Sequence, residues 1–218
     1  MSLAIFDLDH TLLNGDSDHA WGEFLVRQQI VDPSFYQRQN DHFYEQYKQG
    51  TLDIQEYLTF ALEPLTRFPV QELELMHRQF MRDFINPMRQ RRADALLQKH
   101  RDQGDFLLII TATNRFITAP IARSMAVDDL LATDPEIQGD HYTGRVKGVP
   151  CYREGKVQRL QEWLADTDHS LDDSYFYTDS INDLPLLEAV THRFVVDGDD
   201  RLREEAQRRN WTQMSLRD

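Results

Sequence analysis

The stretch AIFDLDHTLLNGD, residues 4–16, decides the fold of this 218-residue chain. Its apolar start predicts a short buried strand over residues 3–6, and two aspartates, Asp7 and Asp9, follow that strand at once. Neighbouring carboxylates repel each other, and each costs free energy when it leaves water. A pair in this position therefore indicates a functional site at the end of the strand.

Three further apolar segments predict strands, and helical patterns lie between them. The strands are expected at residues 105–111, 174–179 and 193–198, and the helices at 92–103, 155–165 and 183–190. Strands that alternate with helices predict an α/β fold, in which helices cover both faces of a parallel sheet. A β-hairpin is expected at residues 139–154, which alternate and contain glycines.

Residues 15–89 differ from the rest because they contain no convincing strand pattern. They predict several helices, punctuated by Gly50, Pro64 and Pro69. We call this segment the insert, and we expect the core domain to comprise residues 1–14 and 90–218. Aromatic residues recur in the insert near helical spacing, which favours packing between its helices, with a pocket role open for one or two.

Composition limits the possible partners. The formal net charge of −13 argues against broad binding to nucleic acid or to an anionic membrane, but not against a small anionic substrate. The single cysteine, Cys151, excludes an intrachain disulfide and is expected to be a small, partly buried thiol. Because Asp7 interrupts the N-terminal apolar run and no stretch approaches the roughly 20 residues of a membrane span, a cytoplasmic location is expected.

Candidate functional residues lie where the predicted strands end. Ligands of open α/β sheets bind at the carboxyl ends of the parallel strands, so residues far apart in sequence meet there. The residues placed at this edge are Asp7, Asp9, Thr111, Asp179, Asp183 and, at the start of a helix, Lys156.

These residues, in this order, resemble the four motifs of the haloacid dehalogenase-like superfamily of phosphohydrolases. The matching segments are DLDHT at residues 7–11, LLIITATN around Thr111, REGKVQ around Lys156, and YTDSINDLPLL with its two acids. The resemblance covers essentially the whole chain and implies a Rossmann-like core. A helical insert after the first motif is similar to the phosphoserine-phosphatase-like branch, where it forms a mobile cap. Thr178 stands where that branch has glycine.

The resemblance implies a role for each catalytic residue. Asp7 is the nucleophile that attacks phosphorus and becomes an aspartyl-phosphate. Asp9 protonates the leaving alcohol and then deprotonates the water that hydrolyses the intermediate. Lys156 and the Thr111 hydroxyl stabilise the phosphoryl oxygens.

The same resemblance implies a Mg²⁺ cofactor. Its ligands would come from the side chains of Asp7 and Asp179 and from the backbone carbonyl of Asp9, with Asp183 in the outer shell. Hard oxygen donors of this kind suit Mg²⁺. Asp183 has an alternative role, because Ser180 and Asp183 also have the spacing of a helix capping box.

Phosphoserine phosphatases of this branch hold the substrate ammonium with an acid and its carboxylate with an arginine from the insert. Asp16 matches the acid, but Ala61 falls at the position of the arginine, and residues 50–66 contain no arginine. A substrate carboxylate would therefore lack its bidentate partner. The leading substrate is an amino-alcohol phosphate without a carboxylate, such as histidinol phosphate, with phosphoserine as the alternative and amino-acid biosynthesis as the expected setting.

Several questions stay open at this point. Asn114 and Asn182 are expected near the phosphate, either as substrate contacts or as turn residues, and the role of His10 and the oligomeric state are undecided. A phosphotransferase or phosphomutase would carry the same motifs as a phosphatase. A dehalogenase would not need Asp9, and a non-catalytic protein on this fold would usually lack one of the four motifs.

Overall fold

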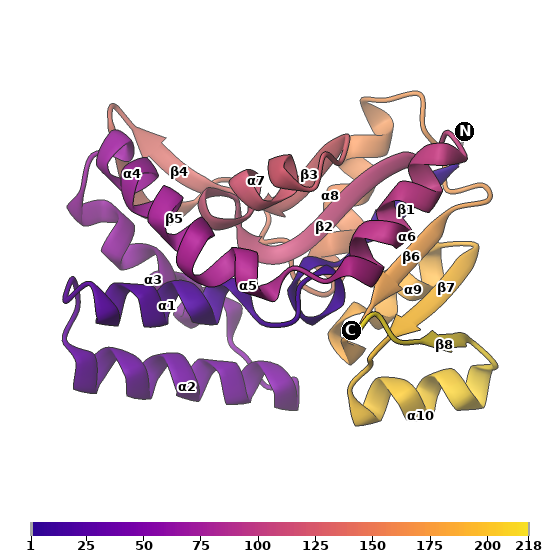
Figure 1. Ribbon diagram of the computed structural model, residues 1–218, viewed down its shortest axis with the longest axis horizontal. Coiled ribbons are helices and arrows are strands. Elements are labelled where there is room, and N and C mark those ends of the chain that lie inside the picture. The colour runs from indigo at the N-terminus through magenta and orange to yellow at the C-terminus, as the bar shows by residue number, and fades with distance from the viewer. Residues whose placement is uncertain (1, 218) are drawn as a thin grey trace.

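The computed structural model describes residues 2–217, so residues 1 and 218 of the predicted core lie outside it (Figure 1). Within this range, six parallel strands form the central sheet, in the order β3-β2-β1-β6-β7-β8. Their bounds are β1 Leu3–Phe6, β2 Phe106–Asn114, β3 Asp129–Thr133, β6 Tyr175–Thr178, β7 His192–Val196 and β8 Thr212–Met214. The parallel sheet confirms the predicted α/β class.

Helices cover both faces of the sheet, because successive side chains of each strand point to opposite sides. Ala4 and Phe6 belong to a buried cluster with α6 and α7, whereas Leu3 and Ile5 pack with α8, α9 and α10. The bounds of these helices are α6 Arg91–Asp102, α7 Arg115–Ser124, α8 Glu154–Ala165, α9 Leu184–Ala189 and α10 Asp200–Arg209. Cys151, expected to be partly buried, is buried in the second cluster.

Two strands have no counterpart in the sequence patterns. Strand β3 is short, and β8 contains only three residues at the edge of the sheet. Both are strands because a neighbour pairs with them: Leu130 lies opposite Ile109 of β2, and Thr212 lies opposite Phe194 of β7. Pairing across the sheet thus overrides a weak local pattern.

Between β1 and α6 the chain is almost entirely helical. After the short π-helical turn η1 Leu8–Leu12, the elements are α1 Ser17–Arg27, α2 Pro33–Gln49, α3 Ile54–Leu62, the 3-10 helix η2 Glu63–Arg67, α4 Val70–Phe80, the π-helix η3 Met81–Ile85 and α5 Asn86–Met88. Asp16, Asp32 and Asp53 cap the first three helices through their carboxylates. An antiparallel bridge joins Leu13 to Arg89, where the chain leaves and rejoins the core. Across the described residues, no helix combines the length and the apolar character of a membrane span.

The predicted hairpin is present but is shifted along the chain. Its strands are β4 Pro135–Gln138 and β5 His141–Val146, whereas residues 139–154 were expected. Gly139, with a φ of +66°, lies in the turn instead of at the start of a strand. Strand β5 packs against α3 and η2, and Val70 N–H donates to the Asp140 carbonyl (2.8 Å). A core segment therefore joins the insert, and the division at residues 15–89 remains a prediction.

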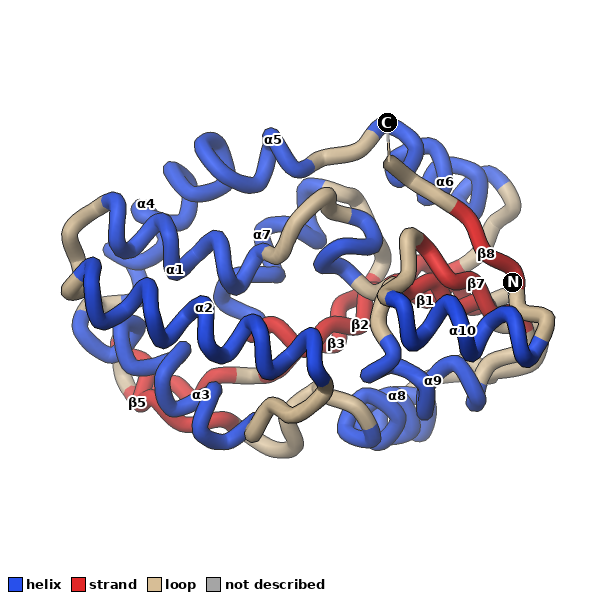
Figure 2. The backbone as a smooth tube through the Cα atoms, turned by 90° about the horizontal axis from the view of Figure 1, so that it is seen from below, coloured by secondary structure: helices blue, strands red, loops and turns tan. Residues whose placement is uncertain are grey.

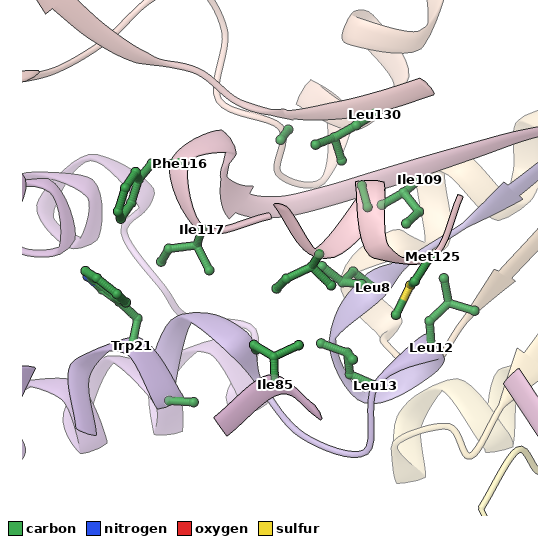
Figure 3. Packing of buried hydrophobic residues seen from close by; sticks show 14 of the residues in the cluster. Leu8, Leu12, Leu13, Trp21, Ile85, Ile109, Phe116, Ile117, Met125 and Leu130 are labelled. Atoms are coloured by element: carbon green, nitrogen blue, oxygen red, sulfur yellow. The ribbon is translucent and has the colours of Figure 1, made fainter. Parts of the chain in front are cut away.

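A buried hydrophobic cluster, which includes aromatic rings, attaches the insert to the sheet domain (Figure 3). Trp21 of α1 lies edge-on to Phe116 of α7, with ring centroids 5.2 Å apart, and it also contacts Phe80. The buried His77 Nε2–H donates to the Ile117 carbonyl (2.8 Å). Aromatic pairs of this kind add to the free energy of burying their apolar surface. The Trp21 side of the insert is therefore firmly held against α7.

Candidate active site

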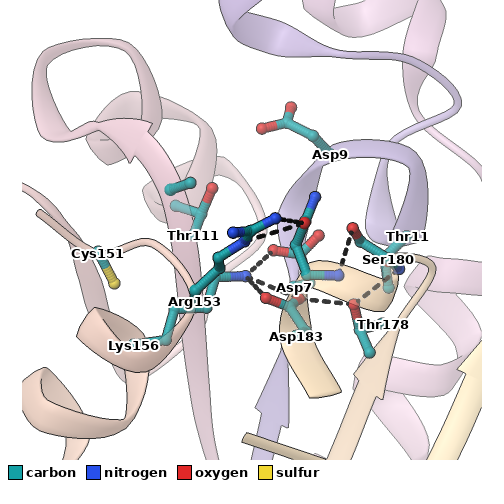
Figure 4. A network of polar contacts seen from close by, with 12 residues as sticks. Asp7, Asp9, Thr11, Thr111, Cys151, Arg153, Lys156, Thr178, Ser180 and Asp183 are labelled. Carbon is teal, nitrogen blue, oxygen red and sulfur yellow. Dashed lines mark hydrogen bonds and ion pairs between the residues drawn. The ribbon is translucent and has the colours of Figure 1, made fainter. Parts of the chain in front are cut away.

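The expected site residues meet at one edge of the sheet. Strand β1 lies between β2 and β6, and all three are parallel, so their carboxyl ends point the same way. Asp7 follows β1, Thr111 lies near the end of β2, and Asp179 follows β6. The Asp7 N–H donates to the Tyr177 carbonyl (2.9 Å), which ties the first motif to β6. Figure 4 shows Asp7 at the centre of this group.

Lys156 bridges two carboxylates in the floor of the site. Its Nζ lies 2.8 Å from Asp7 Oδ1 and 2.7 Å from Asp183 Oδ1, and its side chain is only 2% exposed. Burial by itself would lower the pKa of the Lys156 ammonium, but the charges of Asp183 and Asp7 outweigh burial and raise it. Lys156 therefore remains a cation. It lies beside Asp7, where the sequence led us to expect it.

Asp183 is fixed by contacts that a capping box would not need. Besides Lys156, its Oδ2 accepts a hydrogen bond from the Thr178 hydroxyl (2.7 Å). Ser180 provides its own half of the box, since its hydroxyl accepts from Asn182 N–H at the start of the 3-10 helix η4 Ile181–Asp183 (3.2 Å). The Thr178 that replaces the glycine of the related branch thus orients an acid of the site.

The acids around Asp7 carry more negative charge than Lys156 balances. Burial, together with the charge of Asp183 and against the effect of Lys156, raises the pKa of Asp7 to about 7. Burial and the charges of Asp7 and Asp183 raise the pKa of Asp179 well above its usual range. Asp179 accepts a hydrogen bond from the Thr11 hydroxyl (3.2 Å). A further cation bound here would reduce the repulsion between the carboxylates of Asp7, Asp179 and Asp183.

This donor set fits a hard divalent cation. Within residues 2–217, no three His, Cys, Asp or Glu side chains are arranged to hold a metal ion by themselves. The expected ligands do not require such a group, because they combine the carboxylates of Asp7 and Asp179 with a backbone carbonyl, that of Asp9. The excess of buried carboxylate charge and the oxygen donors together suit Mg²⁺.

Asp9 is held apart from the Asp7–Lys156–Asp183 group, as Figure 4 shows. Its Oδ1 accepts from Ser17 N–H (2.6 Å), and its Oδ2 accepts from the Thr113 hydroxyl (2.9 Å). Burial and the nearby Asp16 raise the pKa of the Asp9 carboxyl well above its usual range. A raised pKa lets a carboxyl keep its proton to higher pH, as a general acid requires.

A cavity opens above these acids, between the sheet edge and the insert. The space between its walls is about 600 Å³ when the open solvent at its mouth is included, and its lining combines acids with aromatic rings. Asp7, Asp9, Thr111 and Thr113 line its core side, and the insert supplies Asp16, Asp18, His19, Asn40, Phe43, Tyr44, Tyr47 and Tyr57. Among the described residues that line this cavity, none is Lys or Arg. The insert aromatics also pack on one another, as the rings of Phe43 and Phe60 do with their centroids 5.2 Å apart. They therefore both pack the insert helices together and line part of the cavity.

Comparison with known proteins gives the family. The family model described as haloacid dehalogenase-like hydrolase matches residues 4–188, most of the chain. The chain belongs to that family. A protein named histidinol-phosphatase from Neisseria meningitidis serogroup C (strain 8013) is 40% identical over 220 residues, which cover 99% of each chain. A protein named phosphoserine phosphatase from Mycobacterium tuberculosis is 28% identical and matches 95% of this chain and 68% of its own.

Solved structures agree with this assignment. A crystal structure of a protein of unknown function from Bordetella pertussis Tohama I has a TM-score of 0.92 at 46% identity, over 99% of this chain and 98% of that one. A phosphoserine phosphatase carrying a phospho-aspartyl intermediate analogue has a TM-score of 0.73 at 16% identity, over 100% and 94% of the two chains. At 16% identity, this similarity shows a shared fold only. The family and the phosphatase class expected from the sequence are confirmed.

Asp16 is the one predicted substrate contact that lines the cavity of this haloacid dehalogenase-like phosphatase. Its Oδ1 caps α1 by accepting from Asp18 N–H (2.9 Å) and His19 N–H (2.8 Å). No described residue donates to its Oδ2. One carboxylate oxygen is therefore used by the fold, and the other is available to a ligand.

The two asparagines, expected either as substrate contacts or as turn residues, are not among the residues that line the cavity, and a contact with substrate stays a prediction. Asn114 Oδ1 caps α7 by accepting from Ile117 N–H (3.3 Å). Asn182 Nδ2 donates to the Tyr47 carbonyl at the end of α2 (3.1 Å). The amides that the sequence suggested for phosphate are thus used to hold helices.

A set of donors from the phosphatase core holds the C-terminal end of α2, which Figure 2 shows reaching from the insert toward the sheet. Arg153 donates to the Gly50 carbonyl and, at 3.1 Å, to Asn182 Oδ1. Arg201 donates to the Gln49 carbonyl (3.2 Å). We call these contacts the α2 latch. They satisfy carbonyls that a helix end leaves free, and they join the end of α2 to the core.

Sequence reasoning missed Thr113, Asp18 and Arg153. Thr113 follows Thr111 with the alternation of a strand, and that spacing was the signal that could have placed both hydroxyls on one side. No local pattern marks Arg153 as a partner of Gly50, which is 103 residues away. His10, left open by the sequence, faces the insert, since its Nε2 lies 3.0 Å from the Tyr44 hydroxyl.

Proposed function

We propose that this phosphatase hydrolyses a small amino-alcohol phosphate, with histidinol phosphate as the leading substrate, through an aspartyl-phosphate on Asp7. The observation that carries the proposal is the acidic cavity above Asp7. Asp16 offers a free carboxylate oxygen to an ammonium group, whereas no Lys or Arg among the described lining residues would receive a substrate carboxylate. The relative named histidinol-phosphatase, at 40% identity over nearly the full length, supports the same substrate.

The proposed reaction has two steps at phosphorus. In the first, a carboxylate oxygen of Asp7 forms a bond to phosphorus, the bond to the alcohol oxygen breaks, and that oxygen takes the proton of Asp9. In the second, Asp9 removes a proton from water, whose oxygen displaces Asp7 and releases inorganic phosphate. Thr113 and Ser17 N–H hold Asp9 for both proton transfers.

Charge compensation is the other requirement of the proposal. Lys156 contacts Asp7 directly and lowers the pKa of its carboxyl against the effect of burial. Mg²⁺, held by Asp7, Asp179 and the Asp9 carbonyl with Asp183 outside, would supply positive charge beside the phosphoryl oxygens. Thr111 lines the cavity next to Asp7 and offers a hydroxyl donor to the same oxygens.

The test compares kcat/KM for histidinol phosphate and phosphoserine in the presence of Mg²⁺ and after chelation with EDTA. We expect a higher kcat/KM for histidinol phosphate than for phosphoserine. Inorganic phosphate should be released when this ester is the only metabolite present, and turnover should be lost in EDTA. Asp7→Asn is the matched control and should remove turnover, because an amide cannot act as the nucleophile. A preference for phosphoserine would refute the substrate, and phosphate transfer to a second metabolite without release would indicate a phosphotransferase.

The proposed partner is this small phosphorylated metabolite alone. The net charge of −13 disfavours polyanionic partners, such as nucleic acid and anionic membranes. A cytoplasmic location remains a prediction from the sequence.

A further inference from the structure

The insert supplies a second carboxylate to the cavity besides that of Asp16. Asp18, in the first turn of α1, lines the cavity and accepts a hydrogen bond from the Tyr57 hydroxyl of α3 at its Oδ2 (2.5 Å). No described residue donates to its Oδ1. Tyr57 therefore orients the Asp18 carboxyl and leaves one oxygen as a free acceptor on the cavity wall.

The three acidic positions follow one another away from the phosphoryl site. Asp9 is tied to the core, since it accepts from Thr113 of β2. Asp16 comes next, at the cap of α1, and Asp18 faces Tyr57 within the insert. Asp16 lies beside both of the other acids: the N–H of Ser17, the next residue, donates to Asp9 Oδ1 (2.6 Å), and Asp18 N–H donates to Asp16 Oδ1 (2.9 Å).

The surroundings of Asp18 suit a flat ring. Phe43, Tyr44 and Tyr57 line the same cavity, and the His19 ring lies 5.0 Å from that of Tyr44. Aromatic walls favour aromatic ligands through stacked and edge-on contacts. A carboxylate oxygen among such walls accepts a hydrogen bond from a ring N–H but offers nothing to a hydrocarbon ring.

We propose that Asp18, oriented by Tyr57, is a specificity-determining residue that accepts a hydrogen bond from a ring N–H of the substrate, so that the site selects amino-alcohol phosphates bearing a nitrogen heteroaromatic ring. The inference rests on the proposed function and adds a recognition element to it. Phosphate at Asp7, ammonium at Asp16 and ring at Asp18 then follow one another along the cavity, in the order in which they occur in histidinol phosphate.

The test uses two esters that differ only in the ring: histidinol phosphate and the same ester with phenyl in place of imidazole. For the wild-type enzyme with Mg²⁺ at pH 8, where Asp18 is ionised, we expect kcat/KM to favour the imidazole ester by about 10- to 100-fold, the worth of a hydrogen bond to a charged group. Asp18→Asn should reduce that ratio to near one, since an amide placed there presents N–H donors toward the ring N–H. Tyr57→Phe should lower the ratio in the same direction.

The matched control is Glu56→Gln, which removes an exposed carboxylate from the neighbouring position of α3 and should leave the ratio unchanged. Equal turnover of both esters by the wild-type enzyme would overturn the inference while leaving the proposed function intact, and so would an equal loss on both esters in Asp18→Asn. Should Asp18→Asn not fold, the wild-type ratio and Tyr57→Phe decide. Failure of the wild-type enzyme to release phosphate from either ester would overturn the proposed function itself.

Discussion

Replacing Asp18 by Asn should make the protein more stable, by an amount that grows with pH. Burial of the Asp18 carboxyl, with the charge of Asp16 beside it, raises its pKa from 3.8 to about 7. One pKa unit corresponds to about 1.4 kcal/mol, so holding this group ionised in the folded state costs about 4 kcal/mol above pH 7. Asn has no charge to bury and can still accept the hydrogen bond of Tyr57.

The sign follows from proton binding. Between pH 3.8 and pH 7 the folded protein retains a proton on Asp18 that the unfolded chain has lost, so the stability of the wild type declines as pH rises through this window. Asp18→Asn removes this decline. The gain in the free energy of unfolding should therefore increase by about 2–3 kcal/mol between pH 5 and pH 8.

The assay is urea unfolding of the two proteins in EDTA at pH 5, 6, 7 and 8, with the exposed Glu56→Gln as a matched loss of one carboxyl. EDTA keeps metal binding from adding its own pH dependence. A gain that stays constant across this range would show that the Asp18 carboxyl does not titrate near pH 7, and the reasoning from its burial would be refuted. Asp18→Asn would then gain stability and lose discrimination between substrates, because a buried functional charge often destabilises the protein that uses it.

Three further predictions concern catalysis and the insert. Asp9→Asn should lower kcat by about 10²- to 10⁴-fold, the usual worth of general acid–base catalysis, and steady-state kinetics that retain wild-type kcat would contradict its role. Thr113→Val removes the 2.9 Å hydrogen bond to Asp9, so kcat should fall by about 10- to 100-fold. The pKa of Asp9 should also rise, because the lost donor favoured the ionised form, and an unshifted alkaline limb of the pH–rate profile would refute this. Arg153→Ala should speed hydrogen exchange at the end of α2, because its bond to the Gly50 carbonyl is lost, and equal exchange would exclude the latch.

The sequence predicts the sheet and the floor of the site because both follow local rules. Apolar runs of four to seven residues mark buried strands, and parallel connections bring their carboxyl ends to one edge. Asp7 and Asp179 could therefore be placed together from the chain order alone. A single lysine in a helical pattern, such as Lys156, does not by itself indicate a function. Its position between the second and fourth motifs identified it.

Other parts of the site depend on contacts that no local pattern records. Asn182 has the motif position of a phosphate contact, yet its amide meets the carbonyl of Tyr47, which lies 135 residues away. Asp18 is a first-turn acid of the kind common at helix starts, and only the approach of Tyr57 makes it a cavity residue. The hairpin was misplaced for a similar reason, because its packing on the insert determines which residues pair.

By itself, the sequence determined the α/β class, the family motifs and the gathering of acids around Asp7, because strand period and parallel connection are properties of the chain order. Which acids line the cavity, and which also cap helices, depends on tertiary contacts. That choice depends on how the insert lies over the sheet edge, which is the sum of many weak long-range contacts. It makes Asp16 and Asp18 a cavity wall, and it assigns Asn114 and Asn182 to holding helices.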